Sequence, residues 1–405
     1  MTALPAPRRP LPVGSVAEFF DTAGLGLLGR GFALSRQNGE WRLYSRRRCV
    51  LLPYAAADTA GVAWLVGALT RGAGLEPVAT EAVQAGECAG VAAVVHALGQ
   101  RLVRPERPPD GSARGRLLVA LRSSIDTLAE ADVDVRLGEP AAVTHLRDAA
   151  RRTRGLLGAG APVLGGRRLG AGIRRELHWF AGELAPARGT EVLAPRLRRR
   201  LTAVPAHSAH DHTRERIAGS FVTDGRARVF GAIGSRRYLQ VLDALDVLEV
   251  VLAETPSRRW AKAARRPAET ELPGLAAPWA AKATRHLRAA ARTPGRDREL
   301  SHVRHAVEKF RCLRDASFPA GAEPSQVAAR LDAVTALLEE HHTAVLAQAH
   351  LRRLTAQAIE AGEDPVTFEK LLRAEREAVE ETAARIPGAW RAVHSASSPL
   401  WTEGT

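Results

Sequence analysis

The sequence predicts a mainly α-helical protein in which a helical bundle follows a small α+β region. Aromatic residues make up only 5% of the 405 residues, while Ala, Leu and Arg are abundant, as is typical of helices that pack through small and aliphatic side chains. After residue 114, apolar residues keep a helical spacing and no strand-like alternation interrupts them. A hydrophobic content of 45% is sufficient for folded cores, and the chain is long enough for more than one domain.

The N-terminal region is predicted to combine strands and helices. Two alternating segments in "GFALSRQNGEWRLYS" (31–45) meet at Asn38 and Gly39. This dipeptide suits a tight hairpin turn, because Asn and Gly are the residues that most readily adopt the positive φ that the turn requires. The same region is expected to hold a third strand at 46–53, a helix at 58–72 opened by an Asp58 cap, and another helix at 90–103.

A stretch rich in Pro and Gly, "RPERPPDGSARG" (104–115), divides the chain. The predicted organisation is an α+β region at 1–104, a linker at 105–113, a helical domain at 114–390 and a tail at 391–405. Helices of the second part are expected at about 114–132, 139–158, 165–185, 188–202, 209–220, 235–253, 274–292, 299–314, 324–342, 343–361 and 365–385, with ends uncertain by roughly 2–4 residues.

Two basic phrases of the helical part follow the same pattern. "HLRDAARRTR" occupies 145–154, and "HVRHAVEKFR" occupies 302–311, 157 residues later. At about 100° per residue, each phrase places its apolar side chains on one arc of a helix and basic side chains beside it. Arg147, Arg151 and Arg154 then stack on one line, which costs a few tenths of a kcal/mol for each like-charged pair. A bound polyanion would compensate this cost, although an ordinary solvated face remains the alternative.

The second phrase departs from the first at one position. Glu308 stands where Arg151 stands in the first phrase, at helical spacing from Arg304 and from Arg311, so it can pair with either. We therefore expect weaker anion binding by this phrase, or arginines that are held more rigidly. Cys312 falls at about 280° on the wheel, outside the apolar arc, which is compatible with partial exposure, and we expect it to pack rather than to react.

The C-terminal part resembles the CHAD domain, an α-helical family named for its conserved histidines. The two basic phrases look like the basic helix of each half of that family. Three further segments carry the resemblance: "IRRELHWFAGELAPARGTEVL" (173–193), "SRRYLQVLDALDVL" (235–248) and "LDAVTALLEEHHTAVLAQAHLRRL" (331–354), the last with His341 and His342 at the turn of a helical hairpin. The resemblance covers residues 114–390.

The resemblance implies a pseudo-two-fold helical bundle with a basic central channel that binds inorganic polyphosphate, in a protein associated with polyphosphate granules. The residues that match the family's binding positions are His145, Arg147, Arg151, Arg152, Arg154, Arg188, His302, Arg304, Lys309 and Arg311. Arg237, Arg285 and Arg288 are further candidates for the channel wall. Polyphosphate also suits the line of Arg147, Arg151 and Arg154, because the planar guanidinium of Arg can donate hydrogen bonds to two phosphate oxygens at once.

The N-terminal part resembles the start of a CYTH domain, the triphosphate-tunnel fold, in "EFFDTAGLGLLGRGFALSRQNGEWRLY" (18–44) and "PYAAADTAGVAWLVGALTRGAGLEPVA" (53–79). In that family, alternating Glu and Lys on an opening strand bind a metal and a triphosphate. Those residues would have to precede Phe20, and "MTALPAPRRPLPVGSVAE" does not contain them. We therefore predict a degenerate region without triphosphatase activity, and we expect no catalytic residue, metal or cofactor.

Charge and remaining motifs limit the other functions. A net charge of +14 favours an anionic partner, and most of it lies after residue 114. No pairing pattern of cysteines, targeting segment or long apolar run is present, so we expect a cytoplasmic protein without a membrane partner. "HSAHDHTRER" (207–216) fits no standard metal spacing and is interpreted as a polar loop or helix cap. Two alternatives stay open: a metal-dependent triphosphatase or polyphosphate hydrolase, and a nucleic-acid-binding protein, which the lack of a recognition module disfavours.

Overall fold

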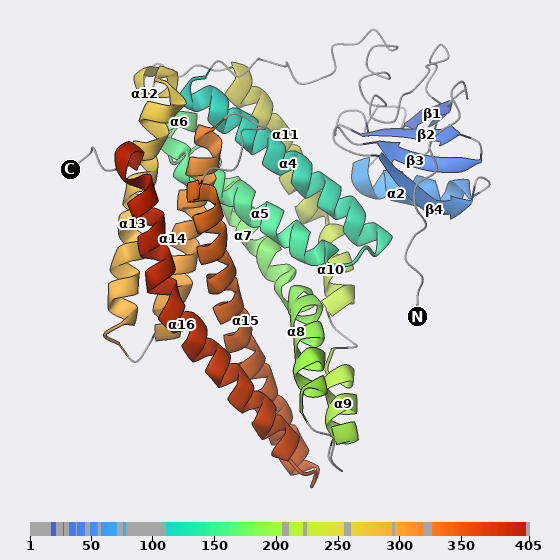
Figure 1. Ribbon diagram of the computed structural model, residues 1–405. Coiled ribbons are helices and arrows are strands. Elements are labelled where there is room, and N and C mark those ends of the chain that lie inside the picture. The colour runs from blue at the N-terminus through green and yellow to red at the C-terminus, as the bar shows by residue number, and fades with distance from the viewer. Residues whose placement is uncertain are drawn as a thin grey trace. The chain divides into compact units, whose positions relative to one another are not determined.

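The computed structural model describes residues 18–21, 27, 32–37, 39–44, 49–55, 58–70, 76–77, 111–204, 210–221, 225–254, 261–293, 296–318 and 326–401. The chain divides into two compact units, one with the N-terminal sheet and one with nearly all the helices (Figure 1). Each unit is described by itself. Within the described residues, no helix is both long enough and apolar enough to cross a membrane.

The N-terminal unit contains an antiparallel sheet with the strand order β4-β3-β2-β1-β5 in its described part. Its strands are β1 (Glu18–Asp21), β2 (Ala33–Gln37), β3 (Glu40–Tyr44), β4 (Cys49–Ala55) and β5 (Glu76–Pro77). The predicted hairpin is present, because Gln37 pairs with Glu40 and Gly39 between them has a φ of 81°. Helix α2 (Thr59–Thr70) begins as predicted, with the Gly61 N–H donating to the Asp58 carboxylate at 2.9 Å.

Two predictions for this unit remain without a structural test. The helix expected at 90–103 lies outside the described residues. The resemblance to the CYTH domain also stays a prediction, because much of residues 1–110 lies outside the described part of the chain.

The second unit is helical throughout its described part, which confirms the predicted fold class. Its helices are α4 (Ala113–Leu137), α5 (Ala142–Ala159), α6 (Ala161–Leu164), α7 (Ala171–Glu183), α8 (Ala185–Thr202), α9 (His210–Gly219), α10 (Gly225–Ile233), α11 (Arg236–Glu254), α12 (Ala261–Arg265), α13 (Ala268–Ala290), α14 (Arg296–Ser317), α15 (Gln326–Glu360) and α16 (Val366–Trp401). The pairs α13–α14 and α15–α16 form long hairpins, and Figure 1 shows α15 and α16 side by side.

Helix α15 differs from the prediction, which placed two helices at 324–342 and 343–361. The structure has one continuous helix there, and His341 lies near its middle with its Nδ1 3.2 Å from the Thr382 hydroxyl of α16. The sequence around His341 holds no Gly or Pro to end a helix. The turn instead follows α15 at Gly362, whose φ of 74° is the left-handed conformation that glycine tolerates.

Other helix boundaries also differ. Helix α13 begins at Ala268 and runs through Pro273 and Pro278, where the sequence had suggested a start after the first proline. Helix α16 continues to Trp401, through most of the segment that was expected to be a tail. The short helices α10 and α12 were not predicted, because nine and five residues are too few for a clear apolar period.

The two basic phrases lie on α5 and α14, which bury the apolar arcs that the helical wheels predicted. Full burial of a Val, Leu or Phe side chain contributes roughly 1.5–3 kcal/mol, so these arcs stabilise the centre of the bundle. The buried side chains are Leu146, Ala149, Ala150, Leu156 and Leu157 on α5, and Val303, Ala306, Val307, Phe310 and Leu313 on α14.

Equivalent positions of the two phrases meet where α5 packs on α14. The Arg151 guanidinium lies 2.5 Å from the Glu308 carboxylate. One turn further, a Cβ added to Gly155 would stand 3.3 Å from the Cys312 sulfur. Each pair is separated by 157 residues, the offset between the phrases. The pseudo-two-fold axis of the bundle therefore passes between α5 and α14 at these residues.

Candidate anion-binding site

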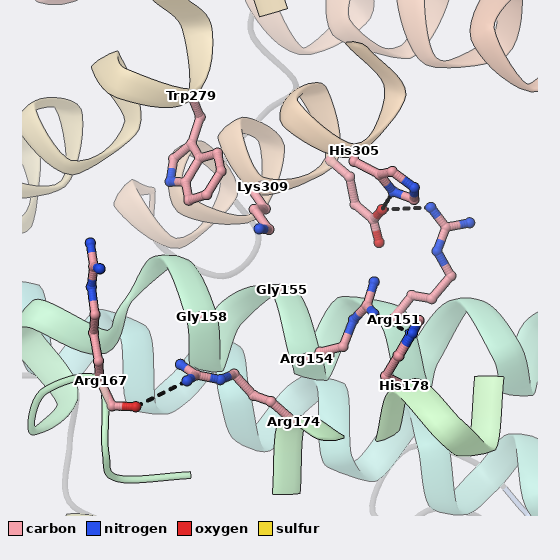
Figure 2. Close-up of a pocket in the computed structure, with 11 residues that line it drawn as sticks. Arg151, Arg154, Gly155, Gly158, Arg167, Arg174, His178, Trp279, His305 and Lys309 are labelled. Carbon is pink, nitrogen blue, oxygen red and sulfur yellow. Dashed lines mark hydrogen bonds and ion pairs between the residues drawn. The ribbon is translucent and has the colours of Figure 1, made fainter. Parts of the chain in front are cut away.

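A basic pocket of about 630 Å³ lies beside this axis (Figure 2). It is formed by α5, α7, α13, α14 and the segment between α6 and α7, so both basic phrases contribute to it. We call it the basic pocket. Its lining residues are Arg151, Arg154, Gly155, Gly158, Arg167, Arg174, His178, Trp279, His305, Glu308 and Lys309.

Helical spacing explains why these side chains converge. On α5, Arg151, Arg154 and Gly158 follow one another at three- and four-residue intervals, which places them on one face. Arg174 and His178 are four residues apart on α7. Figure 2 shows the residues of α5 and α7 facing Trp279, His305 and Lys309 across an open space.

Neutral partners hold most of the cations in place. Arg174 donates hydrogen bonds to the carbonyl oxygens of Arg167 at 2.9 Å and Leu157 at 3.3 Å. Arg154 donates to Nδ1 of His178 at 2.8 Å. The Lys309 ammonium stands 4.1 Å from the centre of the Trp279 ring. These contacts orient positive charge without neutralising it.

The pocket has a strong excess of positive charge. Five Arg and Lys side chains line it against one carboxylate, that of Glu308. Burial, followed by repulsion from Lys282 and Arg154, lowers the pKa of Lys309. Burial also lowers the pKa of Arg154, and nearby Arg151 adds to this effect while Glu308 opposes it. A bound anion would relieve this mutual repulsion.

Glu308 pairs across the axis rather than along its own helix. The prediction that it pairs with Arg304 or Arg311 was wrong, because its partners are Arg151 at 2.5 Å and His305 at 3.9 Å. Arg304 and Arg311 bind other carboxylates, so they are not available to it. Burial acts to raise the pKa of Glu308, but hydrogen bonds and charge from His305 and Arg151 outweigh it and lower the pKa to about 2.

A second group of basic residues lies one turn from Arg151 toward the start of α5. We call it the Glu339 cluster. Glu339 of α15 lies 2.9 Å from both Arg188 of α8 and Arg304 of α14. The residues of the cluster are Arg147, Arg188, Arg304, Glu339 and His342, which are coupled by charge.

The Glu339 cluster also has more cations than carboxylates, even though Asp148 of α5 adds a second carboxylate that is coupled to Arg147 and Arg188. Burial, followed by repulsion from Arg151 and Arg188, lowers the pKa of Arg147 to about 10. Burial and then the charge of Arg304 lower the pKa of His342 to about 3. Nη1 of Arg147 and Nε of Arg188 and Arg304 are buried and have no hydrogen-bond acceptor among the described residues. Such orphaned donors are costly to bury, and phosphate oxygens would satisfy them only after neighbouring side chains moved to admit the anion.

Several predicted binding residues lie elsewhere. Arg152 and Arg311 each approach Asp315 at 3.6 Å, and Arg311 also pairs with Asp332 at 2.6 Å. His145 is exposed on the first turn of α5. His302 lies 3.9 Å from Glu299.

The three further candidates for the channel wall also lie away from the basic pocket. Arg237 pairs with Glu176 at 2.6 Å and stacks 4.0 Å from the centre of the Trp179 ring. Arg285 and Arg288 are exposed on α13. The binding roles of all the predicted site residues, inside the basic pocket and outside it, remain predictions.

Comparison with known proteins identifies the family. The model of the CHAD domain matches residues 119–352, more than half of the chain. The chain belongs to the CHAD domain family.

Other proteins are similar to this chain in sequence or in fold. Two uncharacterized proteins of Mycobacterium tuberculosis, from strains CDC 1551 / Oshkosh and ATCC 25618 / H37Rv, are each 28% identical over 295 residues, which is 72% of this chain. The match covers 55% of each of those proteins, so the chain spans about half the length of the curated relatives. PptA from Streptomyces chartreusis has a similar fold, with a TM-score of 0.55 and 20% identity over 69% of this chain and 99% of that one. The CHAD domain of the plant Ricinus communis also has a similar fold. Its TM-score is 0.51 and its identity 16%, over 72% of this chain and 95% of that one.

Sequence reasoning missed part of the CHAD domain's pocket lining. His305 lies within the second basic phrase, and Arg174 and His178 lie within a segment that carried the family resemblance, so helical spacing from these segments could have found them. Arg167 and Trp279 had no comparable signal, because one lies in a Gly-rich connection and the other on a helix without a basic phrase.

Proposed function

We propose that this CHAD domain binds inorganic polyphosphate in the basic pocket and does not hydrolyse it. The observation that carries the proposal is the set of five Arg and Lys side chains that line one pocket against a single carboxylate. These cations come from both basic phrases, from α7 and from the segment before α7, and those of α5 and α7 face Lys309 across open space (Figure 2). Membership of the CHAD family supports a polyphosphate-related role.

The physical match is between a linear polyanion and separated, fixed cations. Polyphosphate carries about one charge per unit, and each guanidinium can donate two parallel hydrogen bonds to phosphate oxygens. Because each charge-assisted contact contributes roughly 1.5–3 kcal/mol, a few of them suffice for tight binding. We propose that a longer chain continues past Arg151 to the Glu339 cluster, where buried guanidinium donors lack acceptors.

The two alternative functions have less support. A polyphosphate hydrolase needs metal ions held by carboxylates, and the carboxylate that lines the pocket, Glu308, is engaged by Arg151. A nucleic-acid duplex presents its phosphates on a convex surface, whereas these cations lie in a recess. We also propose association with polyphosphate granules in the cell, which follows from binding of the polymer.

The test is a binding titration of the full chain with long-chain polyphosphate and with duplex DNA, at equal phosphate concentration and several salt concentrations. We expect preference for polyphosphate at every salt concentration. Arg154→Glu with Lys309→Glu should weaken binding by tenfold or more, because two charge-assisted contacts are each reversed. The matched control is Arg285→Glu with Arg288→Glu, which makes the same charge change at two exposed positions of α13.

Two outcomes would contradict the proposal. One is a higher affinity for DNA than for polyphosphate. The other is an equal loss of affinity in the double variant and in two exposed substitutions such as Arg285→Glu with Arg288→Glu, since general charge rather than the pocket would then control binding. Release of orthophosphate from tripolyphosphate in the presence of Mg²⁺ or Mn²⁺ would favour the enzyme alternative.

A further inference from the structure

Two histidines and a glutamate come together where α13 and α14 are joined. His286 lies near the end of α13, and Glu299 and His302 lie one turn apart near the start of α14. Each residue offers one ligand atom, and these atoms all lie within 4.8 Å of one another. None of the three lines the basic pocket, so this group is separate from the proposed polyphosphate site.

The donor atoms converge on the Glu299 carboxylate. Nδ1 of His286 lies 2.6 Å from Oε2 of Glu299, and Nδ1 of His302 lies 3.9 Å from the same oxygen. The two imidazole rings are 4.8 Å apart between centroids and tilted by 51°, so they are not stacked face to face. All three side chains are only half-buried, which leaves the group accessible from solvent.

An independent observation concerns His302. Its Nδ1 is buried and has no hydrogen-bond partner among the described residues, although the rest of the ring is partly exposed. A buried imidazole nitrogen without a partner is unfavourable. This nitrogen lies on the side of the ring that approaches Glu299. A metal ion bound by the Glu299 carboxylate would give it a partner.

We infer that His286, Glu299 and His302 bind one first-row transition-metal dication, with Zn²⁺ as the probe. Imidazole nitrogen and carboxylate oxygen are ligands that Zn²⁺ accepts at about 2.0–2.2 Å. Around a tetrahedral ion such bonds place ligand atoms about 3.4 Å apart. The His286–Glu299 distance would lengthen and the His302–Glu299 distance would shorten, both by less than about 1 Å. The two imidazole nitrogens, which lie within 4.8 Å of each other, would approach by up to about 1.4 Å, and side-chain rotation can supply these changes. The fourth position would be left to water.

The site belongs to the second half of the bundle alone. At the offset of 157 residues, His302 corresponds to His145, and Glu299 corresponds to Ala142. Within the described residues, His286, Glu299 and His302 form the candidate metal-binding group. His207 of the "HSAHDHTRER" segment lies outside those residues. A bound ion would join α13 to α14 and so stiffen the hairpin that carries Trp279 and Lys309.

The test is equilibrium dialysis of the chelator-treated, tag-free full chain against Zn²⁺ in a buffer free of phosphate and polyphosphate, with the metal measured by elemental analysis. We expect one equivalent of zinc in the parent protein. Glu299→Gln and His302→Ala should each weaken binding by more than the roughly 10–100-fold that loss of an outer-shell partner costs. The control is His145→Ala, which removes the corresponding histidine of the first phrase and should keep the parent's affinity.

Circular dichroism would show that each variant is folded, and Co²⁺ substitution would report the ligand set through its visible absorption. Loss of the tetrahedral cobalt spectrum in His286→Ala, with the fold retained, would support the site. The inference is overturned if the parent binds no zinc, or if the Glu299 and His302 variants bind as tightly as the parent. Because polyphosphate is absent from this experiment, its outcome is independent of the proposed function.

Discussion

Arg151 and Glu308 stand at equivalent positions of two repeated basic phrases and form an ion pair, 2.5 Å long, across the pseudo-two-fold axis. The pair lies between the basic pocket and the Glu339 cluster, since Arg151 lines the pocket and also repels Arg147 and Arg304. The Glu308 carboxylate is therefore paired with the Arg151 guanidinium. A polyphosphate chain would need that guanidinium in order to contact both the basic pocket and the Glu339 cluster.

Replacement of this carboxylate should affect stability and binding in opposite directions. Glu308→Gln removes the closest charged partner of the buried Arg151 and leaves it the longer contact with Asp148 at 3.9 Å, so the free energy of unfolding should fall by up to about 3 kcal/mol. Polyphosphate affinity should rise by about tenfold, because Arg151 becomes free for a contact worth roughly 1.5–3 kcal/mol. Urea unfolding and calorimetric titration measure the two effects. The exposed Glu381→Gln serves as the control, and weaker binding by Glu308→Gln would show that Glu308 does not compete with the ligand.

The Trp279 ring is predicted to position Lys309 for the ligand. Trp279→Leu removes the contact at 4.1 Å and should weaken polyphosphate binding about two- to fivefold, because a cation–π contact contributes roughly 0.5–1 kcal/mol. The matched control is Trp179→Leu, which removes the contact between Trp179 and Arg237 at 4.0 Å, away from the pocket. Equal effects of the two substitutions on affinity would mean that Lys309 needs no such support.

Two glycines of α5 are expected to respond differently to the same substitution. Gly158→Ala should stabilise the protein by about 0.5–1 kcal/mol, because Ala favours a helix and its Cβ would have no neighbour closer than 3.8 Å. Gly155→Ala should stabilise it less or destabilise it, since its Cβ would stand 3.3 Å from the sulfur of Cys312.

Thermal unfolding of both alanine variants checks this prediction. Cys312→Ser in the Gly155→Ala background changes the opposing atom and tests whether the sulfur is the cause. Cys312 itself is buried, and burial raises the pKa of its thiol to about 12, in agreement with the packing role expected from the sequence. If Gly155→Ala stabilises the protein as much as Gly158→Ala does, then α5 and α14 are not held closely at this point.

His342 should make stability depend on pH. Burial and the charge of Arg304 lower its pKa from 6.5 to about 3 in the folded protein. Between these values the unfolded chain binds a proton that the folded protein does not, so the free energy of unfolding decreases as the pH falls from 6.5 toward 3. His342→Asn should flatten this part of the profile, as measured by urea unfolding at a series of pH values. An unchanged slope would show that the His342 ring is protonated in the folded state.

Glu308 adds a second, more acidic dependence. Because its pKa is about 2 in the folded protein against 4.5 ordinarily, its contribution is complete above 4.5 and is lost as the pH falls toward 2. Glu308→Gln should remove this dependence while leaving that of His342 in place. The pH dependence of His342 begins at 6.5 and that of Glu308 at 4.5. The two substitutions thus distinguish the contribution of the Glu339 cluster to stability from that of the basic pocket.

The sequence by itself determined the positions of most long helices and the faces that α5 and α14 bury. Leu146, Leu156 and Phe310 lie in the apolar arcs that their spacing predicted, because helical periodicity is a local property of the chain. The family resemblance that the two phrases carry implied a two-fold bundle, and the Asn38-Gly39 dipeptide predicted the hairpin of β2 and β3.

Only the tertiary structure decided which charges face one another. Glu308 had partners of suitable spacing on its own helix, yet Arg151 from the opposing helix pairs with it, because the choice depends on how two distant helices pack. The same packing brings Arg174 and Trp279 into the basic pocket. It places His302 outside that pocket and beside His286. A long-range arrangement of this kind follows from the sum of many weak contacts across the bundle, and no short stretch of sequence contains it.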